Sequence, residues 1–308
     1  SSATAYINNI QNRKNNIVSQ LRGGVEMLLA ENGVTVLNGT ASFIDEKNIH
    51  VDLNIGGTEN VTAKNIIIAT GSSPFTPNIP GSDLKGVITT DDLLEIDYIP
   101  KRLAVIGAGT VGVEFAGIFN ALGSEVSIII RYPRVLRKLD VETISKFSTP
   151  FFKQGLNLVV DVTIKAIEKT ENGLVVISEN KNTGEEVRTE ADTVLMSAGR
   201  RPNINKLNLE NAKIQYCENG IEVNDNYQTN ISNIYAIGDV FGKIMLAHVA
   251  SDQGIKVVEY ILEGKEIKPL GPIPDCVFSF PEIATTGKTE EQVKEEGIDY
   301  SVGRFAFA

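Results

Sequence analysis

Apolar residues near the start of the chain recur at helical spacing. Their intervals of three, four or seven residues put them on one face of a helix, and they are Ile7, Ile10, Ile17, Leu21, Val25 and Leu28. We expect a helix over residues 4–31, in which Gly23 and Gly24 weaken the pattern locally. The pattern then changes to short strands separated by turn residues. These strands are expected at residues 34–37, at 49–53, around Val61 and at 66–69.

The next part of the chain alternates apolar strands with helical segments, a pattern that favours a parallel sheet. Pro74, Pro77 and Pro80 indicate a linker into this part. A strand at 103–106, a helix at 113–122 and a strand at 126–130 form a βαβ unit, and a third parallel strand is expected at 157–162. The later elements are a hairpin of 175–178 with 187–190, strands at 193–197 and 234–239, and a helix at 246–262.

The turn of the βαβ unit carries a glycine pattern. Gly107, Gly109 and Gly112 fit G-x-G-x-x-G between an apolar strand and a helix. The first glycine permits a tight turn, the second lets the backbone approach a diphosphate, and the third lets the helix pack on the strand. The helix start can bind phosphate through its free N–H groups, so we expect a dinucleotide site that also includes Ala108, Thr110 and Val111. A structural turn without a ligand is the alternative.

The residues after the second strand narrow the choice of nucleotide. An NAD site usually carries Asp or Glu about 20 residues past the glycines, whereas this chain has Arg131, Arg134 and Arg137. Arginine binds a 2′-phosphate through charge-assisted hydrogen bonds, which favours NADP(H) over NAD(H). The alternative is a solvated surface cluster. We include Val162, at the end of the expected third strand, in the same site.

Composition and charge exclude several classes of protein. The 308 residues are 42% hydrophobic and 22% charged, as in soluble globular proteins of about two domains. A net charge of −10 argues against binding nucleic acid or an anionic membrane. Neither an apolar run of about 18 residues nor a secretory signal is found, so we expect a cytosolic protein. The two separate cysteines, Cys217 and Cys276, argue against a metal cluster or a disulfide framework.

Several motifs in order resemble the flavoprotein disulfide reductases that bind two dinucleotides, above all those of the dihydrolipoamide dehydrogenase type. Besides the glycine motif with Glu114, they are Gly-Gly-Val-Glu26, Ile-Ala-Thr-Gly-Ser72, Ser-Ala-Gly-Arg-Arg-Pro-Asn203, Tyr-Ala-Ile-Gly-Asp239, Met-Leu-Ala-His248 and Pro-Glu-Ile-Ala284. The arginine tract instead resembles glutathione reductase, whereas Gly112 stands where the NADPH enzymes often have Ala.

The resemblance implies an α/β fold in which a Rossmann-like NAD(P)-binding domain is inserted in an FAD-binding domain. We assign residues 1–97 to the first FAD segment, 98–225 to the NAD(P) domain, 226–270 to the second FAD segment and 271–308 to the start of a dimerisation domain. It also implies FAD and NAD or NADP as cofactors. The parent protein is then a homodimer, which takes part in a 2-oxoacid dehydrogenase or glycine cleavage complex.

The resemblance also assigns residues to the cofactors. Asp239, after Gly238, would accept hydrogen bonds from the flavin ribityl chain, and a helix starting near Met245, Leu246, Ala247 and His248 would lie beneath the flavin. Thr70 and Gly71 would cross close to FAD, and Ala41 would contact its adenine. Ser197, Ala198, Gly199 and Arg200 would lie along the nicotinamide nucleotide.

The chain also departs from the pattern of these enzymes. The redox Cys-x4-Cys pair, the first FAD glycine motif and the His-Glu pair of the reductases are absent from this sequence. The lysine that pairs with Glu114 is also missing, so Glu114 is expected to be unpaired, and the chain itself is expected to lack disulfide reductase activity. The alternatives are another NADPH-dependent disulfide reductase or a non-catalytic nucleotide-binding module.

Overall fold

The structure, a computed structural model, describes residues 3–306. The chain folds into two compact units, each built from segments that are not continuous in the sequence. Of the described residues, unit 1 contains 3–8, 74–199 and 271–306, and unit 2 contains 9–73 and 200–270. No helix within residues 3–306 combines the length and the apolar character needed to cross a membrane.

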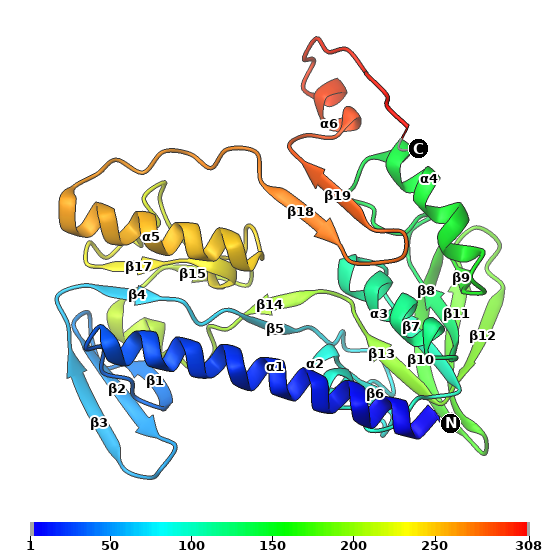
Figure 1. The fold of residues 1–308 in the computed structure, drawn as a ribbon, viewed down its shortest axis with the longest axis horizontal. Coiled ribbons are helices and arrows are strands. Elements are labelled where there is room, and N and C mark those ends of the chain that lie inside the picture. Colours follow the sequence, from blue (N-terminus) through cyan, green and yellow to red (C-terminus); the bar gives the residue numbers. More distant parts are fainter. Residues whose placement is uncertain (1–2, 307–308) are drawn as a thin grey trace. The chain divides into compact units, whose positions relative to one another are not determined.

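Unit 1 is built on a five-stranded parallel sheet with the order β6-β13-β7-β8-β9 (Figure 1). These strands are β6 (Val87–Ile88), β7 (Arg102–Ile106), β8 (Glu125–Ile129), β9 (Asn157–Val159) and β13 (Thr193–Met196). A second, antiparallel sheet contains β10 (Val162–Thr170), β11 (Gly173–Asn180) and β12 (Glu186–Ala191). The helices of the unit are α2 (Thr90–Leu94), α3 (Thr110–Ala121), α4 (Val141–Phe152) and α6 (Glu290–Glu295).

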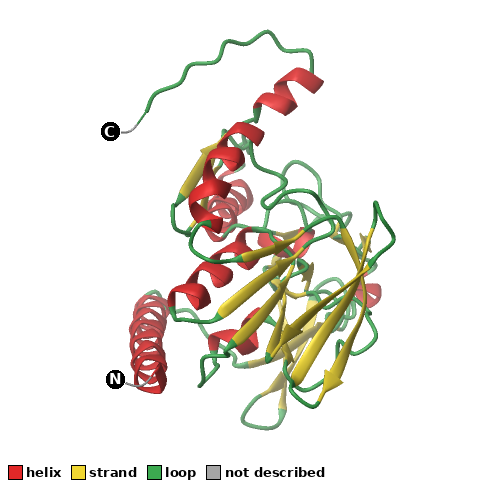
Figure 2. Cartoon of the chain, turned by 90° about the vertical axis from the view of Figure 1, so that its right-hand side faces the viewer, coloured by secondary structure: helices red, strands yellow, loops and turns green. Residues whose placement is uncertain are grey.

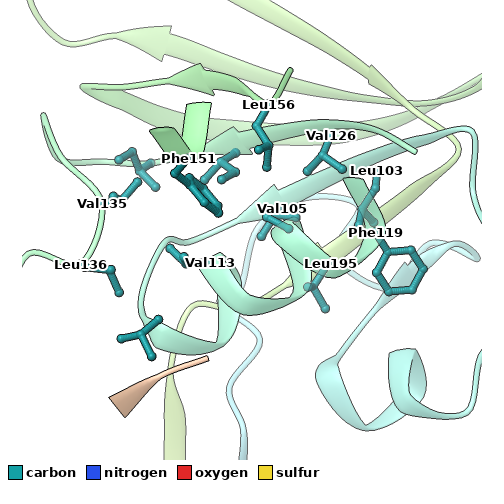
Figure 3. Packing of buried hydrophobic residues seen from close by; sticks show 14 of the residues in the cluster. Leu103, Val105, Val113, Phe119, Val126, Val135, Leu136, Phe151, Leu156 and Leu195 are labelled. Atoms are coloured by element: carbon teal, nitrogen blue, oxygen red, sulfur yellow. The ribbon is translucent and has the colours of Figure 1, made fainter. Parts of the chain in front are cut away.

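The parallel sheet is covered on both faces. Successive residues of its strands point to opposite sides, so each strand contributes side chains to two apolar clusters. Leu103 and Val105 of β7 pack with α3 and α4 in one apolar cluster, which Figure 3 shows from close by. Ala104 and Ile106 of the same strand pack on the other side, against residues of the antiparallel sheet. Figure 2 shows the strands of this unit in yellow and the helices in red.

Arg102, the first residue of β7, makes several polar contacts with other strands and turns of unit 1. Arg102 Nη2 lies 2.7 Å from Asp192 Oδ1 and 2.6 Å from the Asn172 carbonyl oxygen, and Nη1 pairs with Glu190. Its backbone N–H also donates to Asp192. Burial raises the pKa of the Asp192 carboxyl, but the hydrogen bonds from Arg102 outweigh it, so the pKa is lowered overall. Arg102 thus connects the parallel sheet to the antiparallel one.

The last described segment of the chain packs on unit 1. It contains the antiparallel pair β18 (Pro274–Val277) and β19 (Ile283–Thr286), followed by α6. Arg304 binds Glu142 of α4 through two nitrogens, with Nη2 2.7 Å from Oε2. Gln154 Nε2 donates to the Phe280 carbonyl oxygen at 2.6 Å. These polar contacts attach the segment to α4.

Unit 2 contains a three-stranded antiparallel sheet and a parallel pair of strands. The sheet consists of β1 (Gly39–Phe43), β2 (Asn48–Leu53) and β3 (Thr58–Thr62), and the pair of β4 (Ile66–Ile68) and β17 (Ile234–Ala236). The remaining strands are β5 (Ser72–Pro74), β14 (Arg200–Pro202), β15 (Tyr216–Cys217) and β16 (Gly220–Ile221). The helical elements are most of α1 (Ala3–Glu31), η1 (Leu209–Ala212), η2 (Gly238–Phe241) and α5 (Ala247–Glu263).

The predicted helix over residues 4–31 is confirmed as α1, but its apolar stripe is largely exposed. Ile7 is buried, whereas Ile10, Ile17, Leu21, Val25 and Leu28 are exposed. The glycine pair at 23 and 24 does not interrupt the helix.

Three predicted strands differ from the structure, and the one expected at 234–239 ends at Ala236 as β17. The strand expected at 34–37 is wrong: these residues are irregular, and β1 begins at Gly39, because β2 pairs with 39–43. The expected third parallel strand ends at Val159 as β9, because Asp161 has a φ of 54° and turns the chain, so that Val162 begins the antiparallel strand β10.

The central segment of unit 1 is not the range 98–225 that we assigned to the nucleotide domain, and that assignment stays a prediction. This segment begins at residue 74 because β6 pairs with β13 inside it. It ends at 199 because the following segment packs in unit 2, where Leu207 and Ile214 join the cluster around Phe43 and Ile68.

Candidate functional site

The glycine turn of unit 1 is packed tightly on one side and open on the other. Gly107 has a φ of 109°, and a Cβ there would lie 2.4 Å from the Ser197 carbonyl oxygen. A Cβ on Gly112 would lie 2.2 Å from the Gly107 carbonyl oxygen. A Cβ on Gly109 would meet nothing within 4 Å. The open side therefore has room for a phosphate group against the backbone of Gly109.

Helix α3 starts at this open side. Gly109 is its N-cap and provides no side-chain cap. The first-turn N–H groups of a helix have no intrahelical acceptor, and the helix dipole favours negative charge there. Thr110, Val111 and Gly112 form this first turn, with Ala108 directly before it. The arrangement can bind a diphosphate, as the sequence predicts.

The arginine loop, which we define as residues 131–138, is joined to the glycine turn. The backbone N–H of Leu136 donates to the Ala108 carbonyl oxygen at 2.8 Å. Val135 and Leu136 are buried in the cluster of Figure 3. Arg131 and Arg137, on either side of this buried pair, are exposed. The loop therefore holds two guanidinium groups at the surface while its backbone is fixed beside the glycine turn.

Position 130, where an NAD site usually carries an acidic residue, is a buried isoleucine. Ile130 is 5% exposed and follows the end of β8. Arg134 is half-buried, and its Nη1 atom is buried without a hydrogen-bond partner among residues 3–306, while its Nη2 donates to the Arg137 carbonyl oxygen at 3.0 Å. A buried donor without an acceptor is costly, so this nitrogen is a source of strain in the loop.

Two residues that the sequence prediction missed contact the arginines of the arginine loop. The guanidinium carbon of Arg137 lies 4.1 Å from the centre of the Tyr132 ring, and Lys181 Nζ lies 5.6 Å from it. Lys181 Nζ also donates to the Arg131 carbonyl oxygen at 2.5 Å. Tyr132 stands among the arginines in the sequence, but Lys181 is 50 positions from Arg131, so no local signal points to it.

The predicted run from Ser197 to Arg200 is divided between the units. Ser197 Oγ donates to the carbonyl oxygens of Ile106 and Gly107, at 3.0 and 3.1 Å, and so lies behind the glycine turn. Ala198 and Gly199 follow in unit 1, whereas Arg200 belongs to unit 2.

The structure places two other predicted residues of unit 1 differently from the expectation. Val162 is 1% exposed in the core between the two sheets, and its N–H donates to the Ile130 carbonyl oxygen. Glu114 was expected to be unpaired, but this is wrong: its Oε1 accepts a hydrogen bond of 2.7 Å from the backbone N–H of Phe278. The last segment of the chain supplies a backbone donor where no lysine is available.

In unit 2 a chain of hydrogen bonds brings three distant segments together. Arg200 Nε donates to Ser72 Oγ at 2.7 Å, and Ser72 Oγ donates to Asp239 Oδ2 at 2.6 Å. Thr70 Oγ1 donates to the Asn203 carbonyl oxygen at 2.8 Å, and Asn203 N–H donates to the Gly71 carbonyl oxygen. Asp239 Oδ1 accepts no hydrogen bond from the described residues, so it can accept one from a ligand hydroxyl.

Helix α5 begins next to this carboxylate. Gly238 N–H donates to Gln253 Oε1 of α5 at 2.7 Å, and a Cβ on Gly238 would lie 3.0 Å from the Ala250 Cβ. The helix starts at Ala247, with Leu246 as an N-cap that provides no side-chain cap. Met245 precedes it and His248 is exposed in its first turn. The positive end of the α5 dipole therefore lies near Asp239, as expected of a flavin site.

Ala41 is less closely connected to this group. It is exposed in β1, opposite Val51 of β2. No hydrogen bond among the described residues joins it to the segment around Asp239. Its contact with an adenine stays a prediction. Both cysteines of the chain are exposed and free, Cys217 in unit 2 and Cys276 in unit 1.

Comparison with known protein families gives two matches. Residues 2–254 match the family described as pyridine nucleotide-disulphide oxidoreductase. Residues 273–308 match its dimerisation domain. Together these matches cover almost the whole chain.

Curated relatives match over nearly the same length. The chain is 37% identical to the mitochondrial dihydrolipoyl dehydrogenase of Pisum sativum over 298 residues, which are 96% of this chain and 59% of the relative. It is 38% identical to the dihydrolipoamide dehydrogenase of Chaetomium thermophilum, with the same coverage. The chain thus spans about three fifths of the length of these relatives.

Solved structures agree with the fold. The HOCl-induced flavoprotein disulfide reductase RclA from Escherichia coli superposes with a TM-score of 0.84 at 29% identity, covering 94% of this chain and 65% of that one. LpdA from Mycobacterium tuberculosis gives a TM-score of 0.84 at 26% identity, covering 94% and 64%.

Proposed function

Because the chain belongs to the pyridine nucleotide-disulphide oxidoreductase family, we propose that it forms the nucleotide-binding part of a flavin-dependent oxidoreductase of the dihydrolipoamide dehydrogenase type. Such an enzyme passes electrons between a dithiol or disulfide, FAD and NAD(P). FAD and the nicotinamide supply the redox chemistry when bound, and the protein supplies binding and orientation. The hydrogen bond from Leu136 to Ala108 carries the proposal, because it sets the arginine loop beside the phosphate turn.

The residues of unit 1 bind the nicotinamide nucleotide. The first-turn N–H groups of α3 bind its diphosphate across Gly109. Arg131 and Arg137 bind a 2′-phosphate, and Ile130 offers no carboxylate to a ribose 2′-hydroxyl. The preferred nucleotide is therefore NADP(H).

The residues of unit 2 bind the flavin. Asp239 accepts a hydrogen bond from a hydroxyl of the ribityl chain, and Ser72 with Arg200 fixes the orientation of its carboxylate. The start of α5, at Leu246 and Ala247, stabilises negative charge on the reduced ring. Thr70 and Gly71 pass close to the cofactor.

The disulfide chemistry needs groups that these 308 residues do not provide. The two cysteines belong to different units and have no redox-pair spacing. The chain itself therefore does not turn over dihydrolipoamide. The parent protein acts as a homodimer in the cytosol, and a 2-oxoacid dehydrogenase or glycine cleavage complex is the setting we propose for it.

The arginine loop favours a second candidate function. An NADPH-dependent disulfide reductase of the glutathione reductase type would use the same two arginines, whereas the Leu-Ala-His248 motif favours the dihydrolipoamide dehydrogenase type. A non-catalytic nucleotide-binding module is the remaining alternative.

Two measurements on the purified chain test the proposal. The visible spectrum between about 350 and 550 nm reports bound flavin, and calorimetric titration gives the affinities for NADPH and NADH. We expect a flavin band after reconstitution with FAD and tighter binding of NADPH. A folded chain that binds neither flavin nor nicotinamide nucleotide would contradict the proposal. Tighter binding of NADH would contradict only the preference for NADP(H).

A further inference from the structure

A further cation, Lys181 of a distant hairpin, lies against the arginine loop. Lys181 lies in the turn between β11 and β12, and its N–H donates to the Asp161 carbonyl oxygen at 2.8 Å. Asp161 N–H in turn contacts the Tyr132 carbonyl oxygen at 3.4 Å. The hairpin is thus attached to the chain just after β8, and Lys181 Nζ reaches the Arg131 carbonyl oxygen.

The turn that carries Lys181 is internally fixed. Asn180 Oδ1 accepts hydrogen bonds from the N–H groups of Asn182 and Thr183, at 2.9 and 3.1 Å. Gly184 N–H donates to the Asn180 carbonyl oxygen at 2.8 Å, and Asn180 N–H donates to that of Glu185. The backbone of Lys181 is already ordered by these hydrogen bonds. Placing its ammonium group at the Arg131 carbonyl oxygen therefore costs less conformational entropy than it would on a flexible turn.

The three arginines of the arginine loop and Lys181 form no ion pair among the residues that the structure describes. Within residues 3–306, the side chains of Arg131, Arg134, Arg137 and Lys181 form no ion pair with a carboxylate, whereas Arg102, Arg188 and Arg304 do. In a chain of net charge −10, neighbouring cations that form no ion pair among the described residues produce a local positive potential. Such a potential attracts an anion that carries more than one charge.

From these contacts we propose that Lys181 is a positioning residue for recognition of the ribose 2′-phosphate. By holding the Arg131 carbonyl oxygen, it fixes the backbone from which the Arg131 side chain reaches the phosphate. It also shares the Tyr132 ring with Arg137, which limits where that guanidinium lies. The inference rests on the proposed binding of NADP(H). It assigns part of the preference for NADP(H) over NAD(H) to a hairpin outside the βαβ unit.

The experiment uses two small nucleotides that differ in the phosphate of interest. Adenosine 2′,5′-bisphosphate carries the 2′-phosphate, and adenosine 5′-monophosphate lacks it. Their dissociation constants are measured by calorimetry for the 308-residue chain and for Lys181→Met, Lys181→Arg and Lys165→Met. Lys165 pairs with Glu179 on the same antiparallel sheet, so Lys165→Met is a matched control.

We expect Lys181→Met to weaken binding of the bisphosphate about tenfold and to leave the monophosphate within about twofold. Lys181→Arg should restore part of the loss, and Lys165→Met should change neither constant. In the unchanged chain, salt should weaken the bisphosphate more than the monophosphate. Equal weakening of both nucleotides by Lys181→Met would overturn the proposal, because it would indicate a purely structural role.

The experiment also separates failure of the proposed NADP(H) preference from failure of the proposed role of Lys181. If the unchanged chain binds the bisphosphate no better than the monophosphate, the preference for NADP(H) is wrong and the role of Lys181 is wrong with it. If the unchanged chain shows the preference but Lys181→Met retains it, only the role of Lys181 is wrong. Should Lys181→Met fail to fold, Tyr132→Leu, which removes the shared ring, must reduce the same preference; an undiminished preference would overturn the proposal.

Discussion

The carbonyl oxygen of Gly107 lies so close to Gly112 that a Cβ added to Gly112 would be 2.2 Å away. The same added atom would be 2.8 Å from Ser197 Oγ, which itself donates to that carbonyl oxygen. Strand β7, helix α3 and the end of β13 therefore meet at this point with no free volume. Alanine, which NADPH enzymes of the resembled type often have at this position, does not fit this packing.

Replacing Gly112 by alanine should therefore destabilise unit 1. The added methyl group forces the start of α3 away from the Gly107 carbonyl oxygen, and overpacking of this kind costs about 1–3 kcal/mol. Urea unfolding followed by circular dichroism measures the loss, and NADPH affinity should fall with it. Unchanged stability would show that the backbone moves freely at this turn.

Replacing Gly109 by alanine should weaken nucleotide binding and leave the stability of unit 1 almost unchanged. Gly109 has a φ of −72°, which alanine adopts, and its added Cβ meets no atom within 4 Å. We expect the free energy of unfolding to stay within about 0.5 kcal/mol. NADPH affinity should fall about tenfold or more, because the methyl group occupies the space of the diphosphate. A Gly109→Ala variant that binds NADPH normally would place the phosphate elsewhere.

Removing Arg102 should weaken the contact between the two sheets of unit 1. Arg102→Leu leaves Asp192 without its cation and the Asn172 carbonyl oxygen without its donor. Both side chains are partly exposed, so solvent limits the loss to about 1–3 kcal/mol. Arg188→Leu is the control, since its ion pairs are more exposed, and should cost about 0.5 kcal/mol or less. Equal effects of the two substitutions would refute this role of Arg102.

The ion pair between Arg304 and Glu142 predicts a dependence on pH. Hydrogen bonds from Arg304 and then Lys146 lower the pKa of Glu142 to about 2. A lowered pKa in the folded state means that the contribution is complete above the ordinary pKa of 4.5 and is lost as the pH falls towards about 2. The difference in thermal midpoint between the unchanged chain and Glu142→Gln should shrink from pH 6 to pH 3. A difference independent of pH would contradict this assignment.

The local patterns predicted the βαβ unit of unit 1 and several of its later strands, but neither α4 nor β10. The strand, glycine turn and helix from residue 102 to 121 follow from short-range rules, because each glycine meets a steric need within a few residues of its position. The arginines could also be found, since they directly follow a recognisable strand. Glu114 could not be placed correctly, because its partner is a backbone N–H at Phe278.

Long-range partners explain the other differences. Residues 34–37 have the composition of a strand, but β2 pairs with the residues that follow them. Lys181 approaches Arg131 only because two antiparallel strands return the chain to the end of β8. Neither relationship leaves a periodic trace in the sequence.

The entry and exit of the long central segment of unit 1 are already joined, since Phe75 N–H donates to the Gly199 carbonyl oxygen at 2.9 Å. A segment whose two ends lie together can be inserted into another chain as a unit, because joining its ends to the host costs little chain entropy. Residues 75–199 contain the glycine turn, the arginine loop and the hairpin of Lys181 together. On the proposed assignment of the sites, a transplant of this one stretch into a related enzyme would carry the choice between NADPH and NADH with it, while the proposed flavin residues at 70–72 and 238–248 stay behind.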